Sequence, residues 1–198
     1  MKSSERRKMT SKEKKDDAEL TSLFDSVAQQ VEEANKSEKY VRPTWDEYFM
    51  TMMEAISLRS TCDRGRSGCV IVRDHQVLAT GYVGSAAGDD HCDDVGHLFQ
   101  KRLNPDGSTS QHCVRTVHAE QNALCQAAKN GVALAGSTLY CRMTPCPVCA
   151  RMIVNCGIKR VVCQRRYHDS KVSVDLFEKC GISLEHMFDE VQQYSNQK

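Results

Sequence analysis

The sequence has no long apolar run and no excess of charge of one sign. No apolar segment approaches the roughly 18 residues that a membrane-spanning helix needs, and from the charged first residues we expect no signal peptide. The 27 Lys and Arg residues are balanced by 26 Asp and Glu residues, which leaves a net charge of +1. Since a nearly neutral chain has no general attraction for nucleic acid or for a charged membrane surface, we expect neither as a partner.

Cysteine, in contrast, is abundant. The chain has 11 cysteines among its 198 residues, and an odd number cannot be fully paired within one chain. Metal-bound and buried thiols in a reducing compartment explain this composition best, so we expect a cytoplasmic protein. The length suits one domain of ordinary size with an extension.

Two short motifs carry the strongest chemical signal, and they are His118-Ala119-Glu120 and Pro145-Cys146-Pro147-Val148-Cys149. One imidazole and two thiolates, from His118, Cys146 and Cys149, form a ligand set suited to Zn²⁺. Three protein ligands leave a fourth position for water, as a catalytic zinc requires. Glu120 is then suited to carry protons rather than to bind the metal.

Each motif alone has an ordinary explanation. A Cys-x-x-Cys pair also occurs as a thiol redox pair or as half of a structural zinc site, and His-Ala-Glu also suits a solvated helix start. Both motifs together, in this order and at a distance that fits a helix, a strand and a turn, favour a catalytic metal site.

We expect three segments along the chain. Residues 1–42 combine a charged tail, over residues 1–19, with an amphipathic helix and a linker. Residues 43–190 form the zinc-dependent domain, and residues 191–198 form a C-terminal tail. The helix would pack on the domain or on another subunit, and it is predicted by apolar residues at helical spacing: Leu20, Leu23, Phe24, Val27 and Val31.

The domain alternates between predicted helices and short strands. Thr44 and Glu47 have the spacing of a capping box, and an apolar face continues from there to Leu58. The patterns predict a β-hairpin over residues 69–79 and an irregular insertion over residues 89–115, with a turn at residues 104–107. The later elements are a helix from near residue 116 to Gly131, strands at 137–142, 160–164 and 182–184, and helices at 146–156 and 172–179. This order predicts a three-layer α/β/α fold whose central sheet is mixed and mostly five-stranded.

Both motifs lie where predicted helices begin. On an ideal helix the side chains of His118 and Glu120 would point about 200° apart, so they can face one pocket only at the N-terminal tip of their helix. Cys146 and Cys149 occupy the first turn of another helix, where the helix dipole favours thiolates. Both helix starts follow strands, at the sheet edge where α/β proteins bind ligands.

From Trp45 to the last strand the chain resembles the cytidine and deoxycytidylate deaminase superfamily, in which His-x-Glu is followed by Pro-Cys-x-x-Cys. It resembles the deoxycytidylate (dCMP) deaminases most, especially the bacterial branch linked to late competence operons. The residues that carry this closer resemblance are Gly81-Tyr82-Val83-Gly84-Ser85, His91-Cys92-Asp93, residues 112–120, Asn122-Ala123 and Tyr167-His168-Asp169-Ser170.

The resemblance implies hydrolytic deamination of dCMP to dUMP, a precursor for thymidylate synthesis. Zinc would activate water for attack on C4 of cytosine, Glu120 would protonate N3 and then the leaving amino group, and ammonia would depart. The backbone near Ala119 would hydrogen-bond the pyrimidine, and Pro145 would shape the pocket wall.

The stretch Gly81–Ser85, which the resemblance places at the substrate, departs from the pattern of the family at one position. Relatives usually have Gly-Tyr-Asn-Gly, whose asparagine contacts the sugar, whereas this chain has Tyr82, Val83 and Gly84 after Gly81. Val83 can neither donate nor accept a hydrogen bond, so either the substrate differs or backbone groups or Ser85 replace that contact.

A substrate phosphate would need cations, and several follow the 160–164 strand. Arg165 is the main candidate, with Tyr167 beside it, because guanidinium groups match phosphate geometry. A group of this kind can equally belong to an ordinary surface loop. The other cations considered are Arg166, His168, Lys171 and Lys129.

A second zinc is also predicted, because some dCMP deaminases carry a structural zinc between the first helix and the insertion. The residues proposed for it are Cys62, Cys92, His112 and Cys113, with His91 and His97 as substitutes. The alternative is that these thiols are free and that the histidine is solvated.

Two rival functions remain at this point. The first is a deaminase with the same chemistry that acts on another cytosine nucleotide or nucleoside, or on a base in tRNA or single-stranded nucleic acid. The second is a zinc-stabilised binding module without activity. Family resemblance also implies a homo-oligomer, a dimer or hexamer, with dCTP and dTTP as possible effectors.

Overall fold

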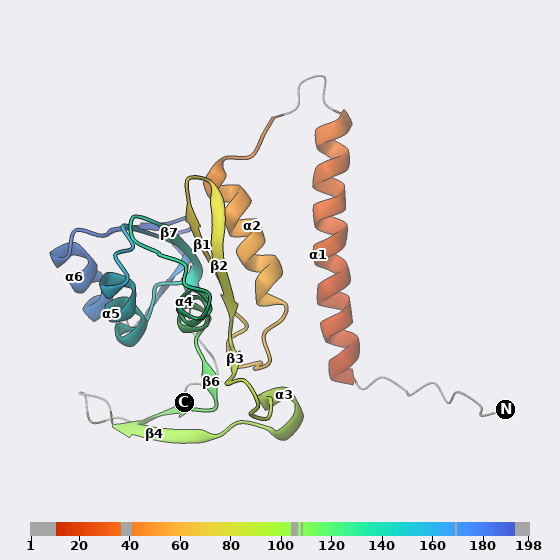
Figure 1. The fold of residues 1–198 in the computed structure, drawn as a ribbon. Helices are drawn as coiled ribbons and strands as arrows, with labels where there is room; N and C mark the ends of the chain where they lie inside the picture. The colour runs from red at the N-terminus through yellow and green to blue at the C-terminus, as the bar shows by residue number, and fades with distance from the viewer. Residues whose placement is uncertain (1–10, 37–40, 104–106, 108, 169, 193–198) are drawn as a thin grey trace. The chain divides into compact units, whose positions relative to one another are not determined.

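The computed structural model describes residues 11–36, 41–103, 107, 109–168 and 170–192 (Figure 1). The chain divides into two units, residues 1–43 and residues 44–198, which are described separately. The predicted turn at residues 104–107 lies outside the described residues except for Gly107. Most of the predicted C-terminal tail lies outside them too, and its first two residues form strand β10, Val191–Gln192.

Helix α1 spans Ser11–Lys36. The helix begins earlier than predicted, because residues 11–19 were assigned to an unstructured tail. Lys and Glu make up five of these nine residues, and both are good helix formers even where nothing apolar can be buried. Further along α1, the side chains of Phe24, Val27 and Val31 are exposed.

Helix α2 spans Trp45–Ser57, and its capping box is confirmed. The Thr44 hydroxyl accepts a hydrogen bond from the Glu47 N–H at 3.3 Å, and the Glu47 carboxylate accepts one from the Thr44 N–H at 2.7 Å. The apolar face of α2 packs Phe49, Met50 and Met53 against the sheet.

The central sheet is mixed, as predicted. Its strands are β1 (Gly68–Arg73), β2 (Gln76–Tyr82), β7 (Thr138–Met143), β8 (Arg160–Tyr167) and β9 (Ser183–His186). Strand β1 pairs antiparallel with β2 and β7, whereas β7, β8 and β9 run parallel. β10 adds a short parallel pair to the end of β8. The β1–β2 turn places Asp74 and His75 at φ 51° and 61°, as a two-residue hairpin requires.

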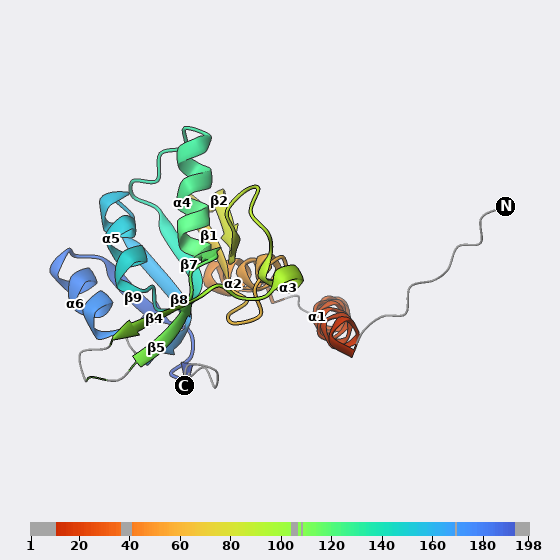
Figure 2. The same ribbon diagram turned by 90° about the horizontal axis from the view of Figure 1, so that it is seen from below.

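Helices cover both faces of this sheet, which confirms the three-layer α/β/α fold. In Figures 1 and 2, α2 lies on one face, and α4 (Ala119–Lys129), α5 (Pro147–Asn155) and α6 (Lys171–Lys179) lie on the other. Neighbouring strand residues point to opposite faces. Thus Val70 packs with α2, whereas Ile71 packs in the core beneath α4 and α5.

The insertion is more regular than the sequence indicated. It contains α3 (Cys92–Val95) and a hairpin of β4 (Phe99–Leu103) and β5 (Thr109–Cys113). A second short pair joins β3 (Gly84–Ser85) to β6 (Thr116–Val117) and leads the chain directly into α4. Among the described residues, no helix combines the length and the apolar character needed to cross a membrane.

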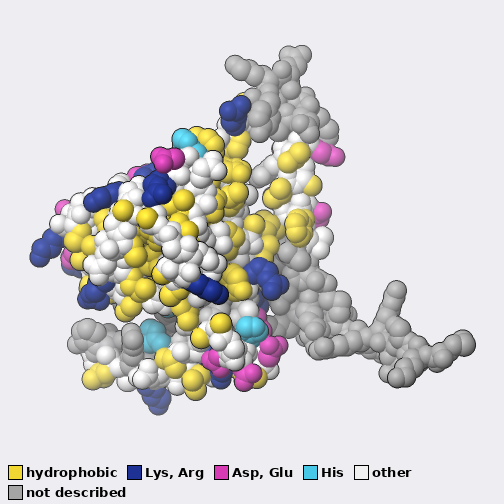
Figure 3. Space-filling view, in the orientation of Figure 1, with side chains coloured by type: hydrophobic (Ala, Val, Ile, Leu, Met, Phe, Trp, Pro, Cys, Tyr) yellow, Lys and Arg dark blue, Asp and Glu magenta, His cyan; other side chains and the backbone are white. Residues whose placement is uncertain are grey.

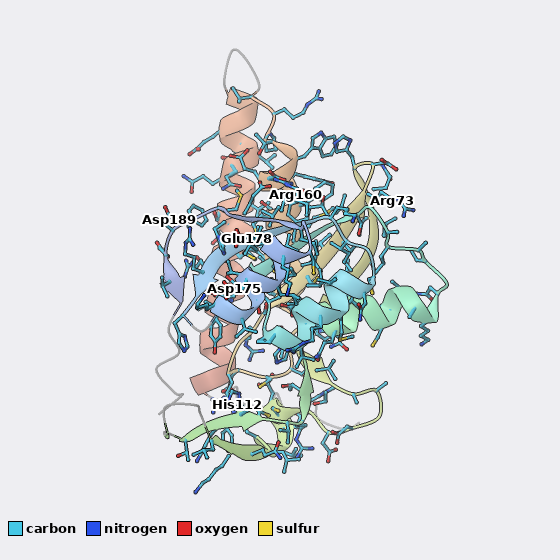
Figure 4. All side chains as sticks on the ribbon, turned by 90° about the vertical axis from the view of Figure 1, so that its left-hand side faces the viewer. Arg73, His112, Arg160, Asp175, Glu178 and Asp189 are labelled. Atoms are coloured by element: carbon cyan, nitrogen blue, oxygen red, sulfur yellow. The ribbon has the colours of Figure 1, made fainter. Side chains whose placement is uncertain are left out.

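An ion-pair network joins the start of α2 to the sheet (Figure 4). The Arg160 guanidinium makes two 2.7 Å contacts with Asp46 and also binds Glu185 at 2.8 Å. Hydrogen bonding to Arg160 lowers the pKa of both carboxyl groups below their usual values of 3.8 and 4.5. The Tyr140 hydroxyl donates to the same Asp46 carboxylate at 2.7 Å.

We predict that Arg160→Leu lowers the free energy of unfolding by about 1–2 kcal/mol at pH 7, less than for a fully buried pair because water reaches the network. A carboxyl group with a lowered folded-state pKa stabilises the protein above its unfolded pKa, and this contribution is lost as pH falls through the folded pKa. The deficit of the variant should therefore shrink below about pH 4 in urea titrations. Lys171→Met, which removes an exposed pair with Asp175, is the control and should change little; an equal loss in both variants would contradict the prediction.

Candidate active site

The two motifs meet where α4 and α5 begin. His118 is the N-cap of α4, with extended backbone angles of φ −67° and ψ 154°, and Glu120 is the second residue of the helix. His118 therefore leaves the helical geometry, and its side chain and that of Glu120 face one site from the helix tip. Cys146 is the N-cap of α5, and Cys149 lies in the first turn of that helix.

The three proposed ligands are spaced as a tetrahedral zinc would require. The Nδ1 atom of His118 lies 3.6 Å from the Cys146 sulfur and 3.5 Å from the Cys149 sulfur. The two sulfurs are 3.5 Å apart. Zinc–sulfur and zinc–nitrogen bonds at tetrahedral angles imply separations of about 3.6 Å for N and S and about 3.8 Å for two sulfurs. The site thus fits zinc without rearrangement.

The side chains of Cys146 and Cys149 contact each other, and this contact shifts their two pKa values in opposite directions. Hydrogen bonding with Cys149, with His118 nearby, lowers the pKa of Cys146 to about 3. The same hydrogen bond, together with burial, raises the pKa of Cys149. Zinc binds thiolates, so metal binding would release the proton of the Cys149 thiol.

Glu120 is buried at the same tip, with one carboxylate oxygen 3.9 Å from the Cys149 sulfur. Burial raises the pKa of Glu120 above its usual value, although His118 opposes this rise. A carboxyl group with a raised pKa takes up and releases protons closer to neutral pH, as general acid–base catalysis requires.

The end of β2, which carries Gly81 and Tyr82 of the predicted substrate-binding stretch, lies against α4. A side chain at Gly81 would clash with the Ala119 carbonyl oxygen at 2.3 Å, so glycine lets this strand touch the helix directly. The Asn122 amide donates to the Tyr82 carbonyl at 2.8 Å and fixes the two elements together. Ala119 and Pro145 are buried, and each is next to a proposed ligand in the chain.

Val83 uses its backbone groups within the protein. Its N–H donates to the Ser67 carbonyl at 3.0 Å, and its carbonyl accepts from the Thr61 N–H at 3.0 Å. Its side chain packs against the core that contains Ala119. Gly84 is buried and pairs with Val117, one residue before His118.

The proposed phosphate cations are arranged differently from the prediction. β8 continues to Tyr167, so Arg165 and Arg166 lie on a strand rather than in a loop. Arg165 is 3.3 Å from Glu190, and Arg166 is 3.1 Å from Asp189, which is labelled in Figure 4. Lys129 ends α4 and is about 15 Å of helix away from His118, so it lies outside this site.

A second cluster of metal-binding side chains joins the segment after α2 to the insertion. Cys62, Cys92, His97 and Cys113 bring their ligand atoms within 4.8 Å of one another. His112 was predicted for this set, but the structure places His97 in it instead. His112 and Cys113 are neighbours on β5, and neighbouring strand side chains point to opposite faces.

The fold and the site define a zinc-dependent hydrolytic enzyme, with three soft metal ligands and a buried carboxylate at the tips of two helices. Residues 43–165 match the model of the cytidine and deoxycytidylate deaminase zinc-binding region. The chain therefore belongs to the cytidine and deoxycytidylate deaminase family.

Individual relatives agree with this family. The chain is 39% identical to ComE operon protein 2 of Bacillus subtilis over 146 residues, which are 74% of this chain and 72% of that protein. It is 35% identical over 167 residues to deoxycytidylate deaminase of Saccharomyces cerevisiae, which covers 82% of this chain but only 52% of the yeast protein. The crystal structure of dCMP deaminase from cyanophage S-TIM5 with dCMP and dUMP is 32% identical, covers 74% of this chain and 99% of that chain, and superposes with a TM-score of 0.59. The predicted resemblance to dCMP deaminases and to the late-competence branch is confirmed.

We predict that Glu120→Gln retains zinc at the unmutated level, because the carboxylate does not hold the metal. Cys149→Ala should lose about one zinc per chain, because it removes one of three ligands. Atomic emission spectroscopy of purified protein measures both, with Cys125→Ala, an exposed cysteine on α4, as the control. Zinc loss in Glu120→Gln would make Glu120 a ligand and contradict its assignment.

Proposed function

We propose that this chain hydrolyses dCMP to dUMP and ammonia in pyrimidine deoxynucleotide metabolism. The observation that carries the proposal is the buried Glu120 carboxylate beside the ligand atoms of His118, Cys146 and Cys149. Zinc, when bound by these three residues, supplies a Lewis acid that makes water acidic enough to react near neutral pH. A binding module without activity would have no use for Glu120 at this position.

Glu120 moves the protons of the reaction. Its carboxylate accepts a proton from the attacking water and gives it to N3 of the cytosine ring. It next accepts the proton of the hydroxyl group added to C4 and passes it to the amino group, so that ammonia leaves as the C–N bond breaks and the C4 carbonyl forms. Ala119 and Pro145 exclude bulk water from the base, which strengthens each of these polar contacts.

Ser85 is the side chain that replaces the missing asparagine. The backbone N–H and carbonyl of Val83 are both engaged by protein partners, so they have no further role in sugar binding. The Ser85 hydroxyl is buried and has no partner among the described residues. We therefore assign the sugar contact to Ser85, which lies two residues after Val83 on β3.

Arg165 is the proposed phosphate ligand, with Tyr167 beside it. Its guanidinium is half-buried, and its present partner Glu190 is 69% exposed. An exposed carboxylate contributes little to an ion pair, so a doubly charged phosphate can displace Glu190 from Arg165. Lys171 is less suited, because it is almost fully exposed and pairs with Asp175 in its own helix.

The second cluster is proposed as a structural zinc site with three thiolates and one imidazole. The Nδ1 atom of His97 faces Cys62 at 3.7 Å, while its Nε2 atom lies 3.1 Å from Asp63. A carboxylate on the far ring nitrogen orients metal-bound histidines in many proteins. Four protein ligands close the coordination shell, as a structural zinc requires.

A nucleotide suits the surface better than a polynucleotide. Figure 3 shows Lys and Arg side chains of the described residues scattered over one face, among acidic and apolar groups. Binding along a phosphate backbone would instead need many clustered cations. Eleven free cysteines agree with a reducing, cytoplasmic location. The proposed oligomer and its regulation by dCTP and dTTP rest on the family resemblance alone.

The function is tested by ammonia release from dCMP, CMP, deoxycytidine, dCTP and short single-stranded DNA. We predict that dCMP is the best substrate and that Glu120→Gln has no turnover. Arg165→Gln should raise KM for dCMP about ten- to a hundredfold, because a charge-assisted hydrogen bond is lost, and should leave the weak turnover of deoxycytidine unchanged. Equal rates on dCMP and deoxycytidine in the unmutated protein would overturn the choice of substrate.

The second zinc is tested by stoichiometry. Protein purified without chelator should hold about two zinc ions per chain, and Cys92→Ser should hold about one and melt at a lower temperature. His97→Ala should behave like Cys92→Ser, whereas His112→Ala should retain both ions. A single zinc in the unmutated protein would remove this site.

A further inference from the structure

The loop that carries Pro145 and Cys146 is held by a side chain that the proposed chemistry does not use. Thr144 lies between the last residue of β7 and Pro145, and its side chain is buried. The Thr144 hydroxyl accepts a hydrogen bond from the Tyr167 N–H at 3.4 Å. It also lies 3.0 Å from Nε2 of His186.

The donors and acceptors of these two hydrogen bonds can be assigned consistently. A backbone N–H can only donate, so the Thr144 oxygen accepts from Tyr167 and its own hydrogen remains for His186. Burial lowers the pKa of His186, which keeps the imidazole neutral and lets Nε2 accept that hydrogen. The buried Thr144 hydroxyl thus has both a donor and an acceptor of the right kind, and satisfied polar contacts of this sort make a site rigid.

The chain of hydrogen bonds joins three parallel strands at the edge where ligands bind. Thr144 follows β7, Tyr167 ends β8 and His186 ends β9. Cys146 is only two residues beyond Thr144, and its sulfur must stay 3.5–3.6 Å from Cys149 and His118 for all three to share one ion. Movement of this loop would move a ligand and the pocket wall together.

We propose that Thr144 and His186 are positioning residues, which hold the Pro145–Cys146 loop in the geometry that retains the catalytic zinc. The inference rests on the proposed zinc-dependent function, but it concerns residues outside both motifs. Removing partners that orient metal ligands typically costs ten- to a hundredfold in metal affinity.

The test is the rate at which the full-length protein releases zinc to a colorimetric chelator. Two zinc sites should give two phases of release, and the phase that is absent in Cys149→Ala protein belongs to the catalytic metal. Thr144→Val and His186→Leu should each speed this phase by about tenfold. The double variant should be no faster than either single one, because the two residues act as one unit. Thr144→Ser and His186→Gln, which keep a hydroxyl and an acceptor, should restore slow release.

Ser137→Ala is the matched control. Its hydroxyl is equally buried, donates to the Leu134 carbonyl at 2.7 Å and lies at the opposite end of β7. This variant should lose stability without changing zinc release. Unmutated release rates in both Thr144→Val and His186→Leu, or additive effects of the two, would overturn the proposal.

Because zinc release needs no substrate, the result is independent of whether dCMP is the natural substrate. If Thr144→Val fails to fold, His186→Leu still decides the question, since it leaves the hydroxyl bonded to the Tyr167 N–H. If His186→Leu protein then released zinc at the rate of the unmutated protein, the role of His186 would be rejected.

Discussion

The contact between the first turns of α4 and α5 is the constraint on which the rest of the domain depends. There the imidazole of His118 meets the sulfurs of Cys146 and Cys149 at 3.5–3.6 Å, a spacing that suits one ion and tolerates little displacement. Gly81 allows α4 to lie directly on the sheet, and the parallel pairing of β7 with β8 sets the position from which α5 begins. Each ligand is an N-cap or a first-turn residue, so the positive ends of two helix dipoles face the thiolates.

The second cluster is connected to the catalytic site in two ways: by a short segment of chain and by hydrogen bonds of Thr61. Cys113 precedes His118 by a short segment that contains β6, which pairs with the substrate strand at Gly84 and Ser85. Thr61, next to Cys62, donates its N–H to the Val83 carbonyl, and its hydroxyl accepts from the Ser85 N–H at 3.4 Å. A metal in the insertion would thus order the strand to which we assign sugar binding.

Local signals in the sequence were sufficient for the catalytic tip. The capping box at Thr44, the alternation of helices and strands, and the two motifs each depend on residues close together in the chain. The predicted fold therefore agreed with the structure, which also brings His118, Cys146 and Cys149 together. Predictions were less accurate where the structure depends on residues far apart in the chain, as in the insertion. His112 was preferred to His97 because the insertion was predicted to be irregular, whereas in the structure His112 and Cys113 are neighbours on β5 and point to opposite faces.

The cations after residue 164 show the same limit. β8 extends to Tyr167 because β10, from the far end of the chain, pairs with Arg166 and Tyr167. Asp189 and Glu190, which form ion pairs with Arg166 and Arg165, directly precede β10 in the chain. The hydrogen bond between Thr144 and His186 was also beyond prediction, since 42 positions separate the two residues.

The central claim is that one imidazole and two thiolates hold the catalytic zinc and leave its fourth position to water. X-ray absorption spectroscopy at the zinc edge tests it most directly when applied to Cys92→Ser protein, in which only the catalytic site should be occupied. We predict a first shell of about two sulfur and two nitrogen or oxygen atoms, with zinc–sulfur distances near 2.3 Å. The same shell should persist in Cys92→Ser protein that also carries Glu120→Gln. A shell with three or four sulfurs, or loss of an oxygen neighbour with Glu120→Gln, would contradict the account.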